Sequence, residues 1–229
     1  MAAPPRHVNG IRAGDVAIAW PRIGRGLPTN WTIQGMNASV QSASTPVAAR
    51  AAGLTPVLQV ETLIIGTGFS GLLAAIRLQR ARCEDFVLLE RSPELGGTWQ
   101  VNSYPGAEVD VPTSLYCISF IPYPFRKSFA PQSELLAYTN HVIDKFGLRR
   151  YARTNQTVAR LDFDEREMLW HVQTKSGEEY TARFVIDASG VLANPHTPRI
   201  KGAESFKGSM FHSGHWDHAV AYEGKRVGV

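Results

Sequence analysis

The stretch Thr62-Leu-Ile-Ile-Gly-Thr-Gly-Phe-Ser-Gly71 decides the fold of this chain. Its apolar run predicts a buried strand, and the apolar spacing that follows it predicts a helix. Between them, the spacing Gly66-x-Gly68-x-x-Gly71 predicts a dinucleotide-binding turn, because a chance match would lack the flanking strand and helix. Gly66 permits the tight turn, Gly68 lets a pyrophosphate approach, and Gly71 allows the helix to pack against the strand. We expect the phosphates to bind the free N–H groups of Phe69, Ser70 and Gly71.

A second apolar run, residues 85–89, predicts the neighbouring strand and ends in Glu90, 19 residues after Gly71. A carboxylate at this position can accept the ribose hydroxyls of an adenosine, and it repels a 2′-phosphate. This pocket is therefore expected to take FAD or NAD rather than NADP.

Composition excludes several classes of protein. The chain of 229 residues has a net charge of +4, and residues 1–60 account for it with five arginines and one acid. The remaining residues hold equal numbers of basic and acidic side chains, so nucleic acid is not an expected partner. Two cysteines cannot form a disulfide framework. The two cysteines fit a reducing compartment, so we predict an intracellular, cytoplasmic location. No apolar run approaches 18 residues, so we predict no transmembrane segment.

The chain divides into four predicted parts. Residues 1–55 form a disordered or loosely docked extension, in which the apolar patch 16–20 could contact the folded body. Organelle targeting by this extension is the alternative to a solvated tail. Residues 56–200 form the dinucleotide-binding domain and 201–223 an interdomain linker. Residues 224–229 open the first strand of a further domain, so we interpret the sequence as truncated.

Within the domain, residues 91–130 are rich in proline and predict a long irregular stretch of functional importance. The apolar stripe that follows predicts a helix over 132–145. Alternation over 157–186 then predicts a meander of strands that covers the parallel sheet.

Two further motifs accompany the glycine turn. They are Gly96-Gly-Thr-Trp-Gln-Val-Asn-Ser-Tyr-Pro-Gly-Ala-Glu-Val-Asp110 and Phe206-Lys-Gly-Ser-Met-Phe-His-Ser-Gly-His-Trp-Asp217. With the glycine turn they resemble the Baeyer–Villiger monooxygenases, which are class B flavoprotein monooxygenases. The patterns of that family are GxGxxG, [AG]GxWxxxx[FY]P[GM]xxxD and FxGxxxHxxxW[PD], and this chain meets all three in order. The resemblance covers about residues 57–229.

The resemblance implies an α/β fold: a Rossmann-like FAD-binding domain, with a parallel sheet, helices and a β-meander, in a flavoprotein type with two dinucleotide-binding domains. It implies an FAD- and NADPH-dependent monooxygenase that inserts one atom of O₂ into a ketone, giving an ester or lactone through a C4a-peroxyflavin. Most of the NADPH site would lie beyond this sequence, so the fragment is expected to be incomplete for turnover.

The resemblance also assigns roles to residues. Asp110 would be the catalytic residue that orients an arginine from a later, missing part of the chain. Glu108 departs from the arginine that many members carry there, which puts NADPH affinity in doubt. The cofactor-binding positions would be Gly66, Gly68, Phe69, Ser70, Gly71, Glu90, Arg91, Gly97, Thr98, Trp99, Asp110, Tyr116, Val158 and Ala188. The linker positions that couple domain movement to chemistry would be Phe206, Gly208, His212, Trp216 and Asp217.

Two alternatives remain open at this point. One is a flavin N/S-oxygenase of the same fold, and the other is a catalytically inactive FAD-binding fragment. A disulfide reductase is disfavoured because no CxxxxC pair follows the first helix. His212, His215 and His218 beside Asp217 have a spacing that fits no common metal site, so no metal is predicted.

Overall fold

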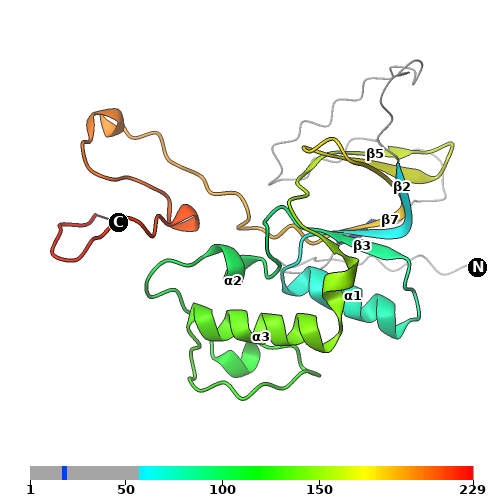
Figure 1. Ribbon diagram of the computed structural model, residues 1–229, viewed down its shortest axis with the longest axis horizontal. Helices are drawn as coiled ribbons and strands as arrows, with labels where there is room; N and C mark the ends of the chain where they lie inside the picture. The colour runs from blue at the N-terminus through cyan, green and yellow to red at the C-terminus, as the bar shows by residue number, and fades with distance from the viewer. Residues whose placement is uncertain (1–16, 20–56, 229) are drawn as a thin grey trace, which may run out of the picture.

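A mixed seven-stranded sheet forms the centre of the structure (Figure 1). The computed structural model describes residues 17–19 and 57–228. Strand order is β4-β3-β2-β7-β6-β5, and β1 pairs with β7 beside β6. The strands are β1 (Ala17–Ala19), β2 (Leu58–Ile65), β3 (Phe86–Leu89), β4 (Ala152–Arg153), β5 (Val158–Asp164), β6 (Leu169–Thr174) and β7 (Glu179–Asp187).

The sheet is parallel on one side and antiparallel on the other. β4, β3, β2 and β7 run parallel, whereas β5 and β6 return antiparallel as a hairpin next to β7. The predicted meander is therefore present, but its last strand is itself part of the parallel sheet. This arrangement places the carboxyl ends of β2, β3 and β7 at one edge.

The two longer helices cover one face of the sheet, below it in Figure 1. Buried Ile64 and Ile186 face α1 and α3, where Leu72, Ile76 and Tyr138 belong to the same core cluster. The longer helices are α1 (Phe69–Arg80) and α3 (Gln132–Lys145), and α3 confirms the helix predicted over 132–145. Short helical turns are α2 (Thr98–Val101), η1 (Thr113–Leu115), η2 (Leu148–Tyr151), η3 (Ala203–Ser205) and η4 (Ser213–His215).

The β5–β6 hairpin curls over the opposite face of the sheet. Leu63, Ile65 and Val185 alternate with the residues that face the helices, and they pack against Val172 and Tyr180. Alternating apolar residues on a strand therefore fill two separate cores, as the period of two in a strand requires. The prediction that the strand-rich block covers the parallel sheet is therefore confirmed for β5 and β6 and wrong for β7, which is a strand of that sheet.

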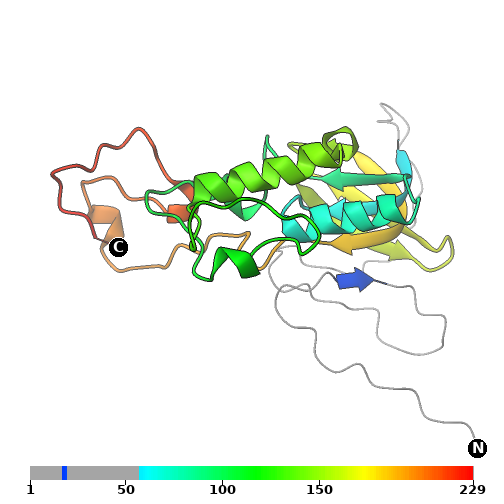
Figure 2. The ribbon, with the colours of Figure 1, turned by 90° about the horizontal axis from the view of Figure 1, so that it is seen from below.

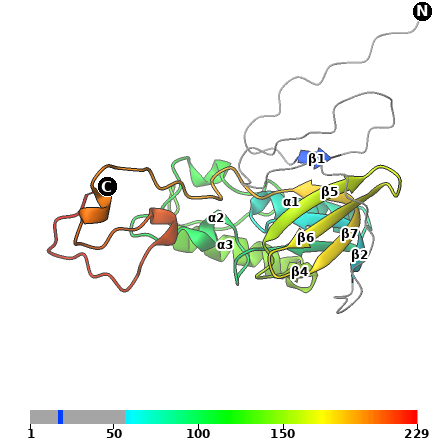
Figure 3. The same ribbon diagram turned by 90° about the horizontal axis from the view of Figure 1, so that it is seen from above.

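After β7 the chain leaves the sheet, and residues 191–228 extend away from it in all three views (Figures 1, 2 and 3). Residues 225–228, expected to open a buried strand, have no strand pairing in the structure, and Val227 is 62% exposed. Near the other end of the chain, Ala17–Ala19 pairs antiparallel with residues 185–187. The rest of the predicted extension lies outside the described residues.

Candidate cofactor site

The glycine turn joins the end of β2 to the start of α1. Gly66 has a φ of +98°, and a Cβ added there would lie 2.5 Å from the carbonyl oxygen of Ala188. A Cβ on Gly71 would lie 2.0 Å from the carbonyl oxygen of Gly66. The N–H of Ala188 in turn donates to the carbonyl of Ile65 at 2.9 Å. Gly66 and Gly71 are therefore required by the packing of strand, helix and the end of β7.

Gly68 has a different role in the turn. It is the N-cap of α1, with a φ of −71°, and a Cβ there would meet only Gly97 Cα at 3.8 Å. No side chain caps the helix, and its first turn contains no acidic residue. The first N–H groups of a helix have no intrahelical acceptor, so those of Phe69, Ser70 and Gly71 can bind an anion.

Glu90 follows β3 at the same edge of the sheet and is 5% exposed. Its Oε2 accepts hydrogen bonds from the backbone N–H of Thr67 at 3.1 Å and from the Thr67 hydroxyl at 2.5 Å. Its Oε1 accepts from the N–H of Ser92 at 2.9 Å. The carboxylate is thus held beside the glycine turn, at the position that the sequence predicts.

The Gly96–Gly97 loop packs against the glycine turn. Gly97 has a φ of +58°, and a Cβ there would lie 2.6 Å from Gly68 Cα. Thr98 begins α2 directly after this contact. Two glycine-containing segments therefore approach each other closely, and both lie next to the start of α1.

Trp99, Tyr116 and Phe69 form an aromatic group beside that helix start. Trp99 is 8% exposed, and its Nε1 donates to the Tyr116 hydroxyl at 3.2 Å. The ring of Tyr116 lies 5.4 Å from that of Phe69, centroid to centroid. Because Phe69 is the first residue of α1, this group connects the second motif to the glycine turn.

The segment before Asp110 turns as the sequence predicts. Gly106 has a φ of +79°, and the N–H of Ala107 donates to the carbonyl of Tyr104 at 3.1 Å, which closes the turn around Pro105. Buried Val109 anchors the strand-like segment that follows, and its N–H donates to the Ala130 carbonyl. Asp110 and its neighbour Glu108 are both exposed.

Two other predicted cofactor positions, Val158 and Arg91, lie outside the glycine turn and differ in burial. Val158 is buried in the core between the hairpin and the sheet. Arg91 is exposed, and its guanidinium donates to the Ala193 carbonyl and to Asn194 Oδ1. Arg91 therefore connects the end of β3 to the segment that leaves β7.

The linker motif is not brought to the glycine turn. His212 Nδ1 accepts from the N–H of Gly214 at 3.0 Å, and Asp217 Oδ1 accepts from the N–H of Ala219. Trp216 packs edge to face against Phe211, with 5.0 Å between ring centroids. Phe206 is 61% exposed, and its ring lies where a Cβ on Gly208 would be. The contact between this segment and the second motif is instead made by His218, whose Nε2 lies 2.8 Å from Ser103 Oγ.

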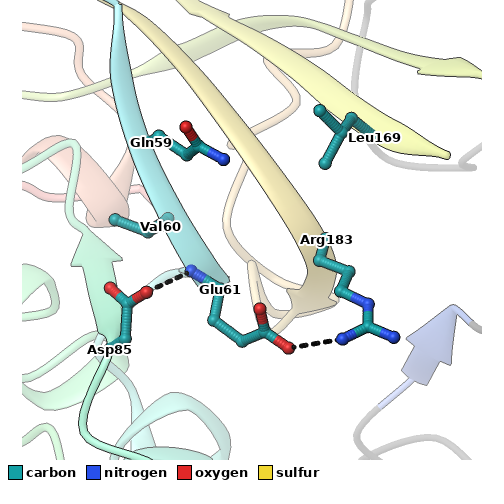
Figure 4. Close-up of a pocket in the computed structure, with 6 residues that line it drawn as sticks. All are labelled: Gln59, Val60, Glu61, Asp85, Leu169 and Arg183. Atoms are coloured by element: carbon teal, nitrogen blue, oxygen red, sulfur yellow. Dashed lines mark hydrogen bonds and ion pairs between the residues drawn. The ribbon is translucent and has the colours of Figure 1, made fainter. Parts of the chain in front are cut away.

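A shallow pocket of about 360 Å³ lies elsewhere on the sheet (Figure 4). Polar and apolar side chains around the amino-terminal half of β2 line it: Gln59, Val60, Glu61, Asp85, Leu169 and Arg183. Arg183 Nη1 lies 3.2 Å from Glu61 Oε1, and Asp85 accepts from the N–H of Glu61. The glycine turn follows the opposite end of β2. This pocket is therefore separate from the candidate site.

Among the described residues, metal-binding side chains converge at the tip of the β5–β6 hairpin. Asp164, Glu167 and His171 have ligand atoms within 4.8 Å of one another. Glu167 and His171 form an ion pair at 3.3 Å. The backbone N–H groups of Glu167 and Arg166 donate to Asp164 and lower the pKa of its carboxyl. The ion pair and the hairpin turn account for the cluster, and we assign no metal to it.

The fold defines a class: an α/β protein with a mixed sheet, in which the glycine turn lies at the carboxyl edge of the parallel strands. The profile of the family described as pyridine nucleotide-disulphide oxidoreductase matches residues 63–229. A Baeyer-Villiger monooxygenase of Streptomyces coelicolor is 44% identical over 171 residues, which are 74% of this chain and 33% of that protein. Cyclohexanone 1,2-monooxygenase of Acinetobacter sp is 35% identical over 177 residues, or 75% of this chain and 33% of the relative.

Solved structures agree with these relatives. Cyclohexanone monooxygenase from Rhodococcus sp. Phi1 bound to NADP+ matches with a TM-score of 0.67 and 33% identity, over 75% of this chain and 32% of that one. The ε-caprolactone-bound form of a cyclohexanone monooxygenase matches with a TM-score of 0.70 and 31% identity, over 74% and 34%. The chain therefore belongs to the pyridine nucleotide-disulphide oxidoreductase family and, within it, to the Baeyer–Villiger monooxygenase family, which confirms the resemblance. It spans about a third of the length of these relatives. Within the described residues, no helix combines the length and apolar character needed to cross a membrane.

Sequence reasoning missed the hydrogen bonds of Thr67, and it weighed His218 only as a metal ligand and missed its contact with Ser103. Thr67 occupies a variable position of the glycine motif, and its side chain is fully buried. His218 lies one residue beyond the linker motif. Neither position carries a motif signal, because each acts through a partner that is distant in sequence.

Proposed function

We propose that this chain binds FAD and forms the flavin-binding part of a monooxygenase that acts on ketones. The observation that carries the proposal is the uncapped start of α1 beside the buried carboxylate of Glu90. A positive helix end and a carboxylate acceptor suit the pyrophosphate and the ribose of an adenine dinucleotide. Solved relatives described as bound to FAD and NADP, or to NADP, support the same choice of cofactors.

The residues at the site fit FAD in distinct ways. The N–H groups of Phe69, Ser70 and Gly71 would bind the pyrophosphate, and Gly68 and Gly97 would leave room for it. Glu90 would accept from the ribose. The backbone at Val158 is proposed to contact the adenine, and Trp99 and Tyr116 would exclude water on the flavin side. Arg91, Thr98 and Ala188 complete the proposed set.

When bound, FAD would supply the redox chemistry, because no amino-acid side chain transfers hydride or activates O₂. The overall reaction consumes a ketone, O₂, NADPH and a proton, and it yields an ester or lactone, NADP⁺ and water. Asp110 is proposed to position a cationic group beside the flavin and to balance its charge. The exposed carboxylate of Glu108 lies two residues before Asp110, and it would weaken the binding of NADPH by repelling its phosphates.

FAD binding is tested with the purified chain. We expect it to retain flavin through gel filtration and to quench or shift flavin fluorescence on titration. Glu90→Gln should weaken FAD binding by about tenfold, because glutamine is neutral and keeps only one of the two acceptor oxygens that Thr67 and Ser92 engage. Glu94→Gln makes the same change at an exposed carboxylate and should leave the affinity unchanged. A folded chain that binds no flavin would contradict the proposal.

The reaction class is tested with the protein purified from its natural source. Supplied with NADPH and O₂, it should convert cyclohexanone to a lactone, as the name of one relative suggests. The rival N/S-oxygenase would instead oxidise an alkyl sulfide and leave the ketone intact. The inactive FAD-binding module would do neither while still binding flavin. Products separated by gas chromatography distinguish the three.

A further inference from the structure

The hydroxyl of Thr67 connects three parts of the candidate site. Thr67 lies between two glycines of the turn and is fully buried. Its Oγ1 donates to Glu90 Oε2 at 2.5 Å, and it accepts from the N–H of Gly96 at 3.3 Å. The glycine turn, the acid after β3 and the Gly96–Gly97 loop therefore meet at one oxygen atom.

Chemistry fixes the direction of these hydrogen bonds. An ionised carboxylate is only an acceptor and a backbone N–H is only a donor, so the proton of Thr67 must point to Glu90. A series of hydrogen bonds then runs from the Gly96 N–H through the Thr67 hydroxyl to the carboxylate. Hydrogen bonds in such a series polarise and strengthen one another. The backbone N–H of Thr67 donates to the same oxygen at 3.1 Å.

The carboxylate of Glu90 is consequently held at both oxygens. Two hydrogen bonds from Thr67 engage Oε2, and the N–H of Ser92 engages Oε1 at 2.9 Å. A carboxylate accepts about four hydrogen bonds, so roughly one position stays open for a ligand hydroxyl. That open position has a fixed direction because the other bonds prevent the carboxylate from rotating.

We propose that Thr67 is a positioning residue that aims Glu90 at one ribose hydroxyl of the cofactor and fixes the Gly96–Gly97 loop beside the pyrophosphate. This inference rests on the proposed binding of FAD. It predicts that recognition of the ribose depends on the hydroxyl of Thr67, although that side chain is fully buried. It also predicts a preference for one of the two hydroxyls.

The test compares ligands that differ by a single hydroxyl. ADP, 2′-deoxy-ADP and 3′-deoxy-ADP each compete with FAD for the chain, and fluorescence gives their affinities. The wild-type chain should lose about tenfold in affinity for one deoxy analogue and less for the other, since the contact is a hydrogen bond to a charged group. Thr67→Val keeps the shape of the side chain without its hydroxyl. It should bring the ratio of the affinity for ADP to the affinity for that analogue close to one. Thr67→Ser restores the hydroxyl and should restore the ratio.

The ratio separates positioning from mere stability. A structural defect weakens ADP and its analogues equally, so an unchanged ratio in Thr67→Val would overturn the inference. If circular dichroism shows that Thr67→Val does not fold, Thr67→Ser and Thr67→Ala serve for the same comparison. The affinity ratio should then be high in the serine variant and close to one in the alanine variant. A folded wild-type chain that binds neither FAD nor ADP would instead overturn the proposed function.

Discussion

Two glycines of one turn meet different physical demands. A Cβ at Gly71 would overlap the backbone of Gly66, since the two atoms would be 2.0 Å apart. A Cβ at Gly68 would make an ordinary contact at 3.8 Å. The fold therefore requires Gly71. Gly68 is not required by packing, but the absence of its side chain leaves the start of α1 open to a ligand.

We predict that Gly71→Ala lowers the free energy of unfolding by about 1–3 kcal/mol, because α1 must move away from the turn. Gly68→Ala should change the free energy of unfolding by less than this. It should weaken FAD binding by about tenfold or more, because the methyl group would occupy the space proposed for the pyrophosphate. Urea unfolding of the flavin-free variants and flavin titration measure the two effects. Equal destabilisation by both variants would contradict this division of roles.

Tyr138 shows how burial couples a single side chain to pH. The residue is fully buried; its hydroxyl accepts from the N–H of Ile118 at 2.8 Å and donates to the carbonyl of Ile121. Burial raises the pKa of Tyr138, and the hydrogen bond from Ile118 only partly offsets this. The hydroxyl therefore holds the 117–125 loop against α3 in its neutral form.

The raised pKa predicts an alkaline loss of stability. The contribution of Tyr138 is complete below the pKa of an unfolded tyrosine, about 10, and is lost as the pH rises through the folded value. We expect urea unfolding at about pH 11 to give a lower free energy than at about pH 8. Tyr138→Phe should cost about 1–3 kcal/mol at the lower pH, because the Ile118 N–H loses its acceptor. It should also reduce the alkaline decline, and an undiminished decline would assign the effect to other groups such as Tyr180, whose pKa burial also raises.

The sequence predicted residues whose role follows from their own chemistry. Gly66, Gly71 and Glu90 could be placed because a turn, a close approach and a terminal acid each require one residue type at one spacing. Thr67 could not, since its hydrogen bonds are to Glu90 and Gly96, which are 23 and 29 residues away. The spatial separation of the linker motif from the glycine turn was also invisible, because a motif fixes spacing along the chain and not distance in the fold.

At the scale of elements, α1 ends in a Schellman motif without the usual glycine. The N–H of Arg82 donates to the carbonyl of Gln79 at 3.0 Å, and that of Cys83 donates to the carbonyl of Leu78 at 2.9 Å. This arrangement places Arg82 in the left-handed region, with a φ of +61°. An L-residue there costs about 1–2 kcal/mol relative to the right-handed region.

We predict that Arg82→Gly stabilises the chain by about 0.5–1 kcal/mol, because relief of the left-handed strain exceeds the added entropy of the unfolded glycine. Arg82→Ala removes the same side chain and keeps the strain, so it is the matched control and should give no gain. The midpoint of urea unfolding measures both. A gain of equal size in the alanine variant would point to the arginine charge instead of the backbone.

Element prediction succeeded where a pattern had room to repeat. α3 spans 14 residues with a clear apolar stripe, and its bounds were predicted. The four-residue α2 and the two-residue β4 were missed, since neither is long enough to show a period. The mixed sheet was only partly foreseen, because β7 looks like the last strand of a meander until its pairing with β2 is known.

At the scale of the whole molecule, residues 191–228 differ from the body in how they are held. Val191 and Leu192 are 80% and 83% exposed, whereas the rest of the described chain buries its apolar side chains in three clusters. The segment is connected to the body through Arg91 and through the contact of Ser103 with His218. Local opening should therefore cost less here than in the sheet.

Limited proteolysis follows from this difference. Within residues 57–228, we predict that trypsin cuts first at the exposed cations of residues 191–228, which are Arg199, Lys201, Lys207, Lys225 and Arg226. Lys145 in α3 and Arg183 in β7 should resist because their backbone is hydrogen-bonded in regular structure. Mass spectrometry of the early fragments identifies the sites. Replacing all five exposed cations by glutamine should slow the first cut without changing the stability of the rest of the chain to urea. Early cleavage at Lys145 or Arg183 would mean that the sheet and helices open as readily as residues 191–228. The division of the molecule into a stable body and a weakly held segment would then be wrong.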